Sequence, residues 1–382
     1  MMDKFAVHIA NTEHVRDKTT FLSIERKVKG LFMNKKNEIT LMNVLFCLIV
    51  IFIHVSSAPI SLLNKQSLQF AAVFIPWRLS SFVVYGFILL SGVKLFLKKE
   101  DKINYKKYYS TRFTHIVLPY ILWVVVYYIY FCQHHYFEFH IVDLIKYILI
   151  GNLSSHFYFV IAIIQFYLLV PVWRAWFRRF HPMLTIVISL LITSLFGQFL
   201  PKMILVFFPN FNFVHNDKLF TSYLVYWTIG CFIGLYYDTF KTILKENRSL
   251  VSVFFVFSTV LNISFSYLNM TGKKNIPFLE TIQMMYVLST IIFIYMVAVK
   301  LAEKTKLTEL KLIQLIDSSS YLIYLSHVLV LIVVNEYLLK FEITGIAISY
   351  LFRIFFVYTI TVSACVAWRL LRTKLSRRHL QK

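Results

Sequence analysis

The amino-acid sequence predicts an all-α, polytopic integral membrane protein, a helical bundle of about ten transmembrane helices with both termini in the cytoplasm. Three observations support this fold class. Of the 382 residues, 58% are hydrophobic and 15% are charged, too few charges to cover a soluble domain of this size. Apolar runs of about 20 residues, the length that spans a bilayer as a helix, recur along the chain. Lysines and arginines gather in alternate connecting segments.

The ten predicted spans are apolar runs separated by polar or proline-containing segments. Helices are expected because hydrocarbon contains no water to satisfy an open backbone. The fifth and sixth spans have the weakest boundaries, because Pro201 and Pro209 interrupt the apolar run between them. The spans cover residues 39–58, 72–93, 113–132, 156–173, 183–200, 219–237, 249–268, 281–299, 319–339 and 343–368.

The basic residues predict the orientation of these spans. Of the 40 lysines and arginines, 31 fall in segments assigned to the cytoplasm, eight fall in outer segments, and Arg353 lies within the last span. Such a bias follows the positive-inside rule. Contact with an anionic inner leaflet also accounts for the formal net charge of +22 without nucleic acid as a partner.

The chain divides into three parts: a cytoplasmic tail (1–37), a transmembrane domain (38–370) and a basic cytoplasmic tail (371–382). Residues 1–37 mix charges of both signs, so they do not resemble a secretory signal peptide. The four cysteines are scattered through apolar runs with no CxxC pair. Neither a disulfide framework nor a metal site is therefore expected.

His54 is the first candidate for chemistry. It ends the apolar run LMNVLFCLIVIFIH and lies about 22 Å along the helix from Ile39, in the outer third of the membrane. An imidazole gains and loses a proton near neutrality, as a general base must. The alternative is an interfacial histidine that reaches water, and position alone does not separate the two.

His327 and Arg353 come from neighbouring antiparallel spans, and both are expected near the middle of the bilayer. The adjacent apolar runs carry no carboxylate at that depth, which favours an anionic ligand or a water-filled cavity. In the alternative interpretation, Arg353 hydrogen bonds carbonyls and hydroxyls such as those of Ser349 and Tyr350.

Arg112 and His115 open the third span, three residues apart on one helical face and next to a lysine-rich loop. This arrangement suits an anionic donor from the cytoplasm, although anchoring to the inner leaflet is equally compatible with it. Ser91 and Gly92 end the second span at the same side. Gly92 permits close approach of a ligand backbone or, more commonly, of a neighbouring helix.

The order of these motifs resembles the membrane acyltransferase family 3, whose members acylate hydroxyls of cell-surface glycans. The resemblance runs from about residue 39 to 370. It rests on MNVLFCLIVIFIH, a first helix ending in histidine; FILLSG, for F-x-x-x-S-G; Arg112 to Tyr120, for R-x-x-R-x-x-x-P-Y; His156 to Phe159, for H-L-W-F; YWTIGCFIG, an aromatic-rich helix ending in glycines; and Ser318 to His327, for S-x-x-x-Y-x-I-Y-L-x-H.

Two positions depart from the family pattern. Asn43 stands where an arginine usually precedes the first-helix histidine, and His115 replaces the second arginine of R-x-x-R. The resemblance extends to the intercellular-adhesion membrane proteins of Gram-positive bacteria, which are assigned either export or acyl modification of poly-N-acetylglucosamine. The same two functions are therefore open for this chain.

The resemblance implies an enzyme, an acyltransferase that transfers groups other than aminoacyl groups. Its substrates would be a cytoplasmic acyl-CoA, with an acetyl or succinyl group, and a hydroxyl of a cell-surface or exported polysaccharide. Acetyl-CoA would be a co-substrate, with no cofactor bound permanently. The implied roles are a general base, His54; an acid that orients it, Glu138 or Asp143; donor binding by Arg112, His115, Ser91 and Gly92; and a route across the membrane lined by His327, Arg353, Tyr324 and Asn43.

The expected setting is the plasma membrane of a bacterium, with membrane lipid, a glycan acceptor and the polysaccharide-synthesis machinery as partners. A transporter or flippase that exports a polysaccharide or lipid-linked sugar without covalent chemistry is the alternative. It would bind a phosphate through Arg353 and His327. The lack of a convincing internal repeat counts modestly against it.

Overall fold

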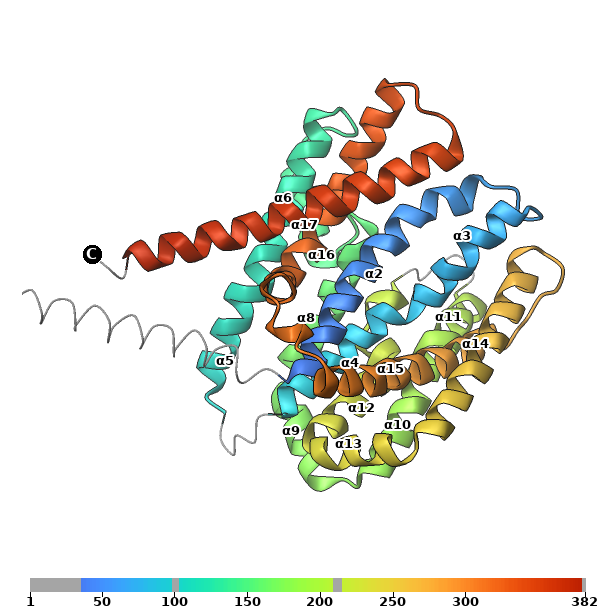
Figure 1. The fold of residues 1–382 in the computed structure, drawn as a ribbon, viewed down its shortest axis with the longest axis vertical. Coiled ribbons are helices and arrows are strands. Elements are labelled where there is room, and N and C mark those ends of the chain that lie inside the picture. The colour runs from blue at the N-terminus through green and yellow to red at the C-terminus, as the bar shows by residue number, and fades with distance from the viewer. Residues whose placement is uncertain (1–35, 98–102, 209–214, 380–382) are drawn as a thin grey trace, which may run out of the picture.

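Helices form all the regular structure in the part of the chain that the structure describes, residues 36–97, 103–208 and 215–379 (Figure 1). This computed structural model has no strand in those ranges, which confirms the all-α prediction. The predicted tail 1–37 lies, except for its last two residues, outside the described residues. At the other end, the last helix continues past residue 370 as far as His379.

The helices follow one another along the chain with short connections. In order they are α2 (Asn37–Leu62), α3 (Leu68–Leu79), η1 (Ser80–Phe82), α4 (Val83–Phe96), α5 (Tyr105–Arg112), η2 (Phe113–Val117), α6 (Leu118–Gln133), α7 (Ile141–Ile150), η3 (Ser155–Phe157), α8 (Tyr158–Leu168), α9 (Val170–Arg179), α10 (Pro182–Ser194), η4 (Leu195–Phe199), α11 (Leu200–Phe207), η5 (Asn216–Lys218), η6 (Phe220–Tyr223), α12 (Leu224–Leu235), α13 (Tyr237–Glu246), α14 (Arg248–Met270), α15 (Leu279–Lys304), η7 (Leu307–Glu309), α16 (Lys311–Lys340) and α17 (Ile346–His379).

Seven stretches of helix among the described residues are long and apolar enough to cross a membrane. They are Asn37–Leu62, Leu68–Phe96, Tyr105–Gln133, Arg248–Met270, Leu279–Lys304, Lys311–Lys340 and Ile346–Leu375. An eighth candidate is a pair of helices, Ile141–Ile150 and Ser155–Leu168, bent by 48° at the break between them. These helices are those of a multi-pass membrane protein.

The predicted count of ten spans is not confirmed. The predicted fifth and sixth spans coincide with two shorter apolar helices, Pro182–Gly197 and Phe220–Leu235. A helix of this length reaches only about 24 Å, whereas the hydrocarbon core is about 30 Å thick. The first runs into a π-helical turn at Leu195–Phe199, and the second begins with a 3₁₀ turn at Phe220–Tyr223. Run length in the sequence therefore overstated the regular helix at both places.

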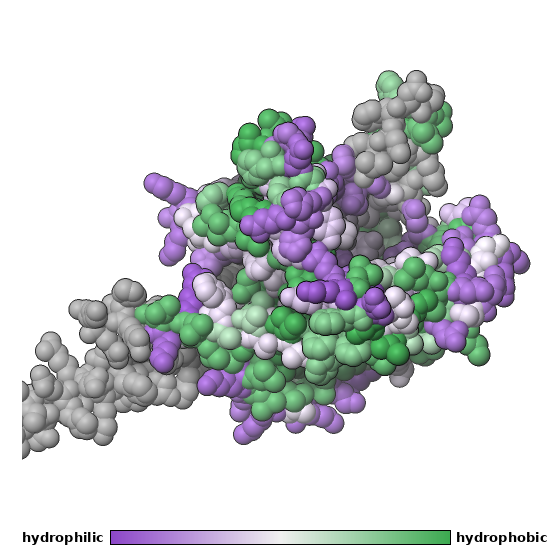
Figure 2. Space-filling model, turned by 90° about the horizontal axis from the view of Figure 1, so that it is seen from above, coloured by the Kyte–Doolittle hydropathy of each residue, from purple (hydrophilic) through white to green (hydrophobic). Residues whose placement is uncertain are grey.

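The outer surface of the bundle is rich in hydrophobic side chains. Figure 2 shows hydrophobic residues over broad parts of the face seen from above, with hydrophilic residues gathered in separate groups. On α14, for example, Val253, Phe257 and Val260 are each more than half exposed. Lipid covers such a surface in a membrane protein, so these positions need no protein partner.

Helix α2 lies inside the bundle and packs against α15, α16 and α17 (Figure 1). Residues on one of its faces, Met42, Phe46 and Val50, belong to the larger hydrophobic core. Residues on another face, including Cys47 and Ile51, belong to a second core shared with α16 and α17. Because protein surrounds α2 on both faces, a buried polar residue such as Asn43 is held by a neighbouring helix.

The closest approach between helices is the crossing of α4 and α12. A Cβ atom added at Gly230 would lie 2.1 Å from the carbonyl oxygen of Leu89, and one added at Gly234 would lie 2.6 Å from that of Val93. Any larger residue must therefore push the two backbones apart. Small residues serve this purpose in membrane bundles, where close van der Waals contact replaces the hydrophobic effect between helices.

We expect Gly230→Ala to destabilise the bundle by on the order of 1–3 kcal/mol, the usual cost of overpacking. The measurement is the thermal unfolding midpoint of the purified protein in detergent. Gly197→Ala is the matched control, because a Cβ atom at Gly197 meets nothing within 4 Å. Equal midpoints for the two variants would contradict the tight crossing.

Candidate functional site

Three histidines from distant parts of the chain meet inside the bundle. His54 comes from α2, His156 from η3 and His327 from α16. The ring centroids are 4.9 Å apart for His54 and His327, 5.1 Å for His156 and His327, and 6.0 Å for His54 and His156. His156 and His327 are buried, whereas His54 is partly exposed. His54 is thus the most exposed of the three rings.

A bend between two consecutive helices brings His156 to this cluster. Helix α7 ends at Gly151, which has a positive φ of 69°, and the 48° bend turns the chain into η3. The Nδ1 atom of His156 lies 3.0 Å from the Ser154 hydroxyl, and the Tyr324 hydroxyl donates to the His156 carbonyl. Its Nε2 atom is buried and has no hydrogen-bond partner.

Backbone carbonyls determine the tautomer of His327. Its Nδ1 atom lies 2.8 Å from the carbonyl oxygen of Tyr324 and 3.2 Å from that of Ile323. Carbonyl oxygens only accept hydrogen bonds, so Nδ1 of the neutral ring carries the proton. The Nε2 atom then presents a lone pair, and it is buried without a donor. His327 is thus a fixed hydrogen-bond acceptor inside the cluster.

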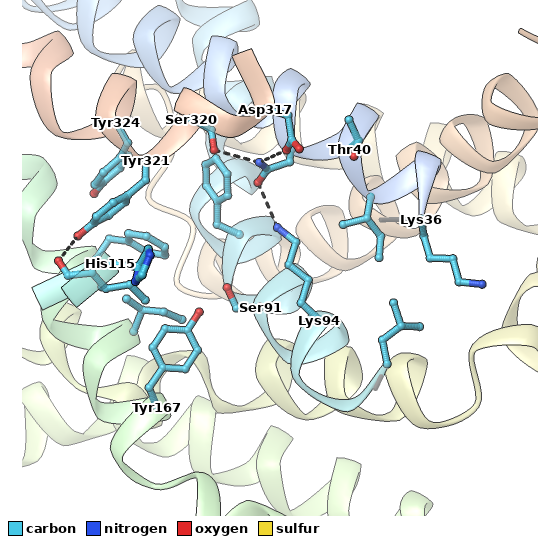
Figure 3. Close-up of a pocket in the computed structure, with 17 residues that line it drawn as sticks. Lys36, Thr40, Ser91, Lys94, His115, Tyr167, Asp317, Ser320, Tyr321 and Tyr324 are labelled. Atoms are coloured by element: carbon cyan, nitrogen blue, oxygen red, sulfur yellow. Dashed lines mark hydrogen bonds between the residues drawn. The ribbon is translucent and has the colours of Figure 1, made fainter. Parts of the chain in front are cut away.

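A cavity of about 450 Å³ lies at the end of the bundle where α2 and α16 begin and α4 ends (Figure 3). Cationic or titratable side chains line part of it, namely Lys36, Lys94 and His115, together with the carboxylate of Asp317. The other lining residues are Ile39, Thr40, Asn43, Phe87, Ser91, Leu97, Ile116, Phe159, Ile163, Tyr167, Ser320, Tyr321 and Tyr324.

A chain of hydrogen bonds crosses one wall of the cavity, drawn as dashed lines in Figure 3. The Lys94 ammonium donates to Asn43 Oδ1 over 3.4 Å, and Asn43 Nδ2 donates to Asp317 Oδ1 over 2.6 Å and to the Ser320 hydroxyl over 3.0 Å. A buried carboxylate is tolerated only with such partners. The wall therefore joins α4, α2 and α16.

An aromatic layer separates the cavity from the histidine cluster. Phe87 and Phe159 have ring centroids 6.0 Å apart, and Phe159 lies 5.3 Å from Tyr324. All three rings line the cavity. On the other side, Tyr324 lies 5.5 Å from the ring of His156 and 6.0 Å from that of His327. A single layer of side chains thus divides the two.

The residues proposed for donor binding are only partly brought together. Ser91 and His115 line the cavity. Arg112 lies beside it, its guanidinium carbon 4.6 Å from the ring centroid of Tyr167, which is itself a lining residue. Gly92 faces the other way, since a Cβ atom there would lie 2.7 Å from the Trp227 carbonyl oxygen. For Gly92, the structure therefore supports helix packing.

The two acids considered as orienting groups lie away from His54. Glu138 forms an ion pair with His140 at 3.9 Å, and Asp143 pairs with Lys146 at 3.1 Å. The Glu138 side chain is exposed and that of Asp143 is about half exposed, and their pairs remain within the segment between α6 and α8. Throughout the described ranges, neither forms a hydrogen bond or ion pair with His54.

Arg353 is bound by neighbouring helices. Its Nε donates to Asn335 Oδ1 over 2.7 Å, and its NH1 donates to the Ser349 hydroxyl over 3.1 Å. The bond to Ser349 is one that the alternative sequence interpretation named. Arg353 therefore links α16 to α17, and neither of these bonds is to His327. Of the four residues expected along the route, Asn43 and Tyr324 line the cavity and His327 belongs to the histidine cluster.

Sequence reasoning did not single out three residues that the structure brings to the site. In the sequence His156 is only the start of a motif, although Gly151 before it marks the end of a helix. Lys94 and Asp317 fall in segments assigned to the cytoplasm, and nothing in the sequence shows their link through Asn43. In the described part of the chain, no group of three or more His, Cys, Asp or Glu residues is arranged to hold a metal ion.

Comparison with known protein families gives a match over most of the chain. A family model described as an acyltransferase domain, that of the membrane acyltransferase family 3, matches residues 36–368. The match includes the three helical segments that carry the histidines. No curated protein and no solved structure matches the chain.

We expect Arg353→Met and Asn335→Leu each to destabilise the protein, because each single change leaves a polar partner unpaired between α16 and α17. The double variant should recover part of the loss, with a coupling energy of about 0.5–2 kcal/mol, the range for such bonds in membrane bundles. The measurement is a double-mutant cycle of unfolding free energies. A coupling energy of zero would contradict the structural role of Arg353.

Proposed function

The chain belongs to the membrane acyltransferase family 3, and on that premise we propose that it transfers an acetyl or succinyl group from a cytoplasmic acyl-CoA to a hydroxyl of a cell-surface or exported polysaccharide. One observation carries the proposal: a cavity with a basic lining lies one aromatic layer away from a cluster of three histidines. A donor site and a proton-transfer site are thus adjacent but separate.

The cavity suits the acyl end of the donor. Its volume of about 450 Å³ lies within the usual range of small-molecule sites. Lys36, Lys94 and Arg112 lie in or beside it and attract the phosphates of the coenzyme. The apolar lining, which includes Ile39 and Ile163, suits the pantetheine arm. The acyl carbon then passes between the rings of Phe87, Phe159 and Tyr324 to reach the histidine cluster.

His54 is the general base in this proposal. Its partial exposure allows an acceptor hydroxyl to reach the ring, while the other two histidines are enclosed. The hydroxyl oxygen attacks the thioester carbonyl carbon as His54 takes the hydroxyl proton. The carbon–sulfur bond then breaks, and the thiolate leaves with the electron pair and receives the proton from His54.

The cellular setting is part of the proposal. The polysaccharide acceptor and the machinery that makes it would lie at the outer face of a bacterial plasma membrane, and acyl-CoA would lie in the cytoplasm. The basic end of the bundle faces the cytoplasm under the positive-inside rule, which places the cavity on the donor side. His54, about 26 Å along α2 from Asn37, then lies toward the acceptor side.

We expect His54→Ala to abolish transfer, because removal of a general base costs about 10²–10⁴-fold in rate. The readout is the ester-bound acyl content of surface polysaccharide in strains with wild-type chain, no chain, or the variant at equal level. His140→Ala is the matched control, since this outer histidine lies apart from the cluster and pairs with Glu138.

Two outcomes would each count against one part of the proposal, the first against acyl transfer and the second against His54 as the base. If the ester content is the same with and without the chain, and the deletion strain retains the polymer inside the cell, the result favours export without covalent chemistry. Ester content that survives His54→Ala removes His54 as the base while leaving the acyltransferase in place.

We further propose ten spans with both termini in the cytoplasm, the two short helices completing the count. An even number of spans is needed to return the chain to its starting side. Asp217→Cys, exposed between those short helices, should then react with a membrane-impermeant maleimide in intact cells. Lys374→Cys should react only after permeabilisation, and the unchanged chain measures the background of the native cysteines. Labelling of Asp217→Cys only after permeabilisation would reduce the count to eight.

A further inference from the structure

A general base needs a partner that selects its tautomer and shares the charge it gains. Carboxylates fill that place in many hydrolases. Around His54 the titratable groups in contact are the two other histidines, with Tyr127 and Tyr324 adjoining them. Glu138 and Asp143 are engaged elsewhere. Over the described ranges, no carboxylate bonds to any ring of the cluster.

Hydrogen bonds fix both the ring of His327 and the backbone around it. Two carbonyls fix its Nδ1–H, at 2.8 and 3.2 Å. The Tyr127 hydroxyl donates to the Leu325 carbonyl over 3.0 Å and accepts from the Leu329 amide over 2.7 Å. These two backbone groups flank His327 and pair with each other in an uninterrupted helix. Tyr127 thus fixes the α16 backbone at this residue from α6.

His327 therefore presents an oriented hydrogen-bond acceptor that has no donor in the structure. The Nε2 atom of His327 is buried and unpartnered, and burying such an atom costs free energy unless a donor occupies the site during function. The nearest ring is that of His54, with centroids 4.9 Å apart. A neutral or protonated His54 has an N–H to offer.

We propose that His327 is the positioning residue for His54, its Nε2 atom accepting a hydrogen bond from one ring nitrogen of His54. This bond leaves the second nitrogen of His54 unprotonated and turned toward the acceptor hydroxyl. When His54 takes the hydroxyl proton, His327 shares the positive charge, and the proton passes to the leaving thiolate. The inference rests on the proposed function, in which His54 is the base.

Two substitutions of His327 test the roles of its two ring nitrogens independently. In His327→Asn, the amide nitrogen takes the place of Nδ1 and keeps the donation to the carbonyls of Ile323 and Tyr324, but no acceptor remains at the place of Nε2. In His327→Gln, the amide oxygen reaches the place of Nε2 and keeps the acceptor. Space filling and polarity are similar in both.

The experiment measures transfer of [¹⁴C]acetyl from acetyl-CoA to endogenous polysaccharide in inverted membrane vesicles, at varied acetyl-CoA. We expect His327→Asn to lower the apparent kcat by about 100-fold or more, as loss of an orienting group does, with KM for acetyl-CoA unchanged. We expect His327→Gln to stay within about tenfold of the wild type, since the accepted bond persists. Protein level and thermal unfolding midpoint accompany each rate.

Several results would overturn this role. A wild-type kcat in His327→Asn would exclude the positioning role. An equal loss of kcat in both variants, together with a lowered unfolding midpoint, would also exclude it, because that result marks a structural residue. If His327→Asn does not accumulate, His327→Gln decides alone, and a rate below a hundredth of the wild type at normal protein level contradicts the inference. Absence of transfer by the wild-type chain removes the proposed function and, with it, the role of His327.

Discussion

Hydrogen bonds along one face of α16 hold the site together. In hydrocarbon each polar group must find its partner within the protein, because an unpaired group costs several kcal/mol. Asp317, Ser320, Tyr321, Tyr324 and His327 each lie three or four residues from another member of the set, which places them along one side of the helix.

Four of these residues bond to three different parts of the bundle. Asp317 and Ser320 accept from Asn43 of α2, the Tyr321 hydroxyl donates to the Ile116 carbonyl over 2.9 Å, and Tyr324 donates to the His156 carbonyl. The cavity wall, the aromatic layer and the histidine cluster are therefore successive levels of one helix face. A shift of α16 would disturb all three together.

The two residues that depart from the family pattern, Asn43 and His115, both line the cavity. Asn43 stands where an arginine is usual, yet the Lys94 ammonium from α4 lies 3.4 Å from its side-chain oxygen. A cation thus remains beside this position, carried by another helix. His115, in place of the second arginine, lines the cavity from an exposed position, and its Nδ1 lies 2.9 Å from the Thr111 carbonyl oxygen. The cation beside position 43 is thus supplied by α4 in place of α2.

The sequence by itself determined the helical class and the approximate place of the apolar helices, and it singled out His54 and His327 as polar residues at membrane depth. It did so because run length and hydropathy act along a single helix, and because a polar residue inside an apolar run is visible without its neighbours. Only the tertiary structure decided that His156 joins them, that Glu138 and Asp143 do not, and that Arg353 bonds to Asn335. Those contacts depend on the bend after Gly151 and on how the helices cross, and neither is encoded in the spacing of residues along one helix.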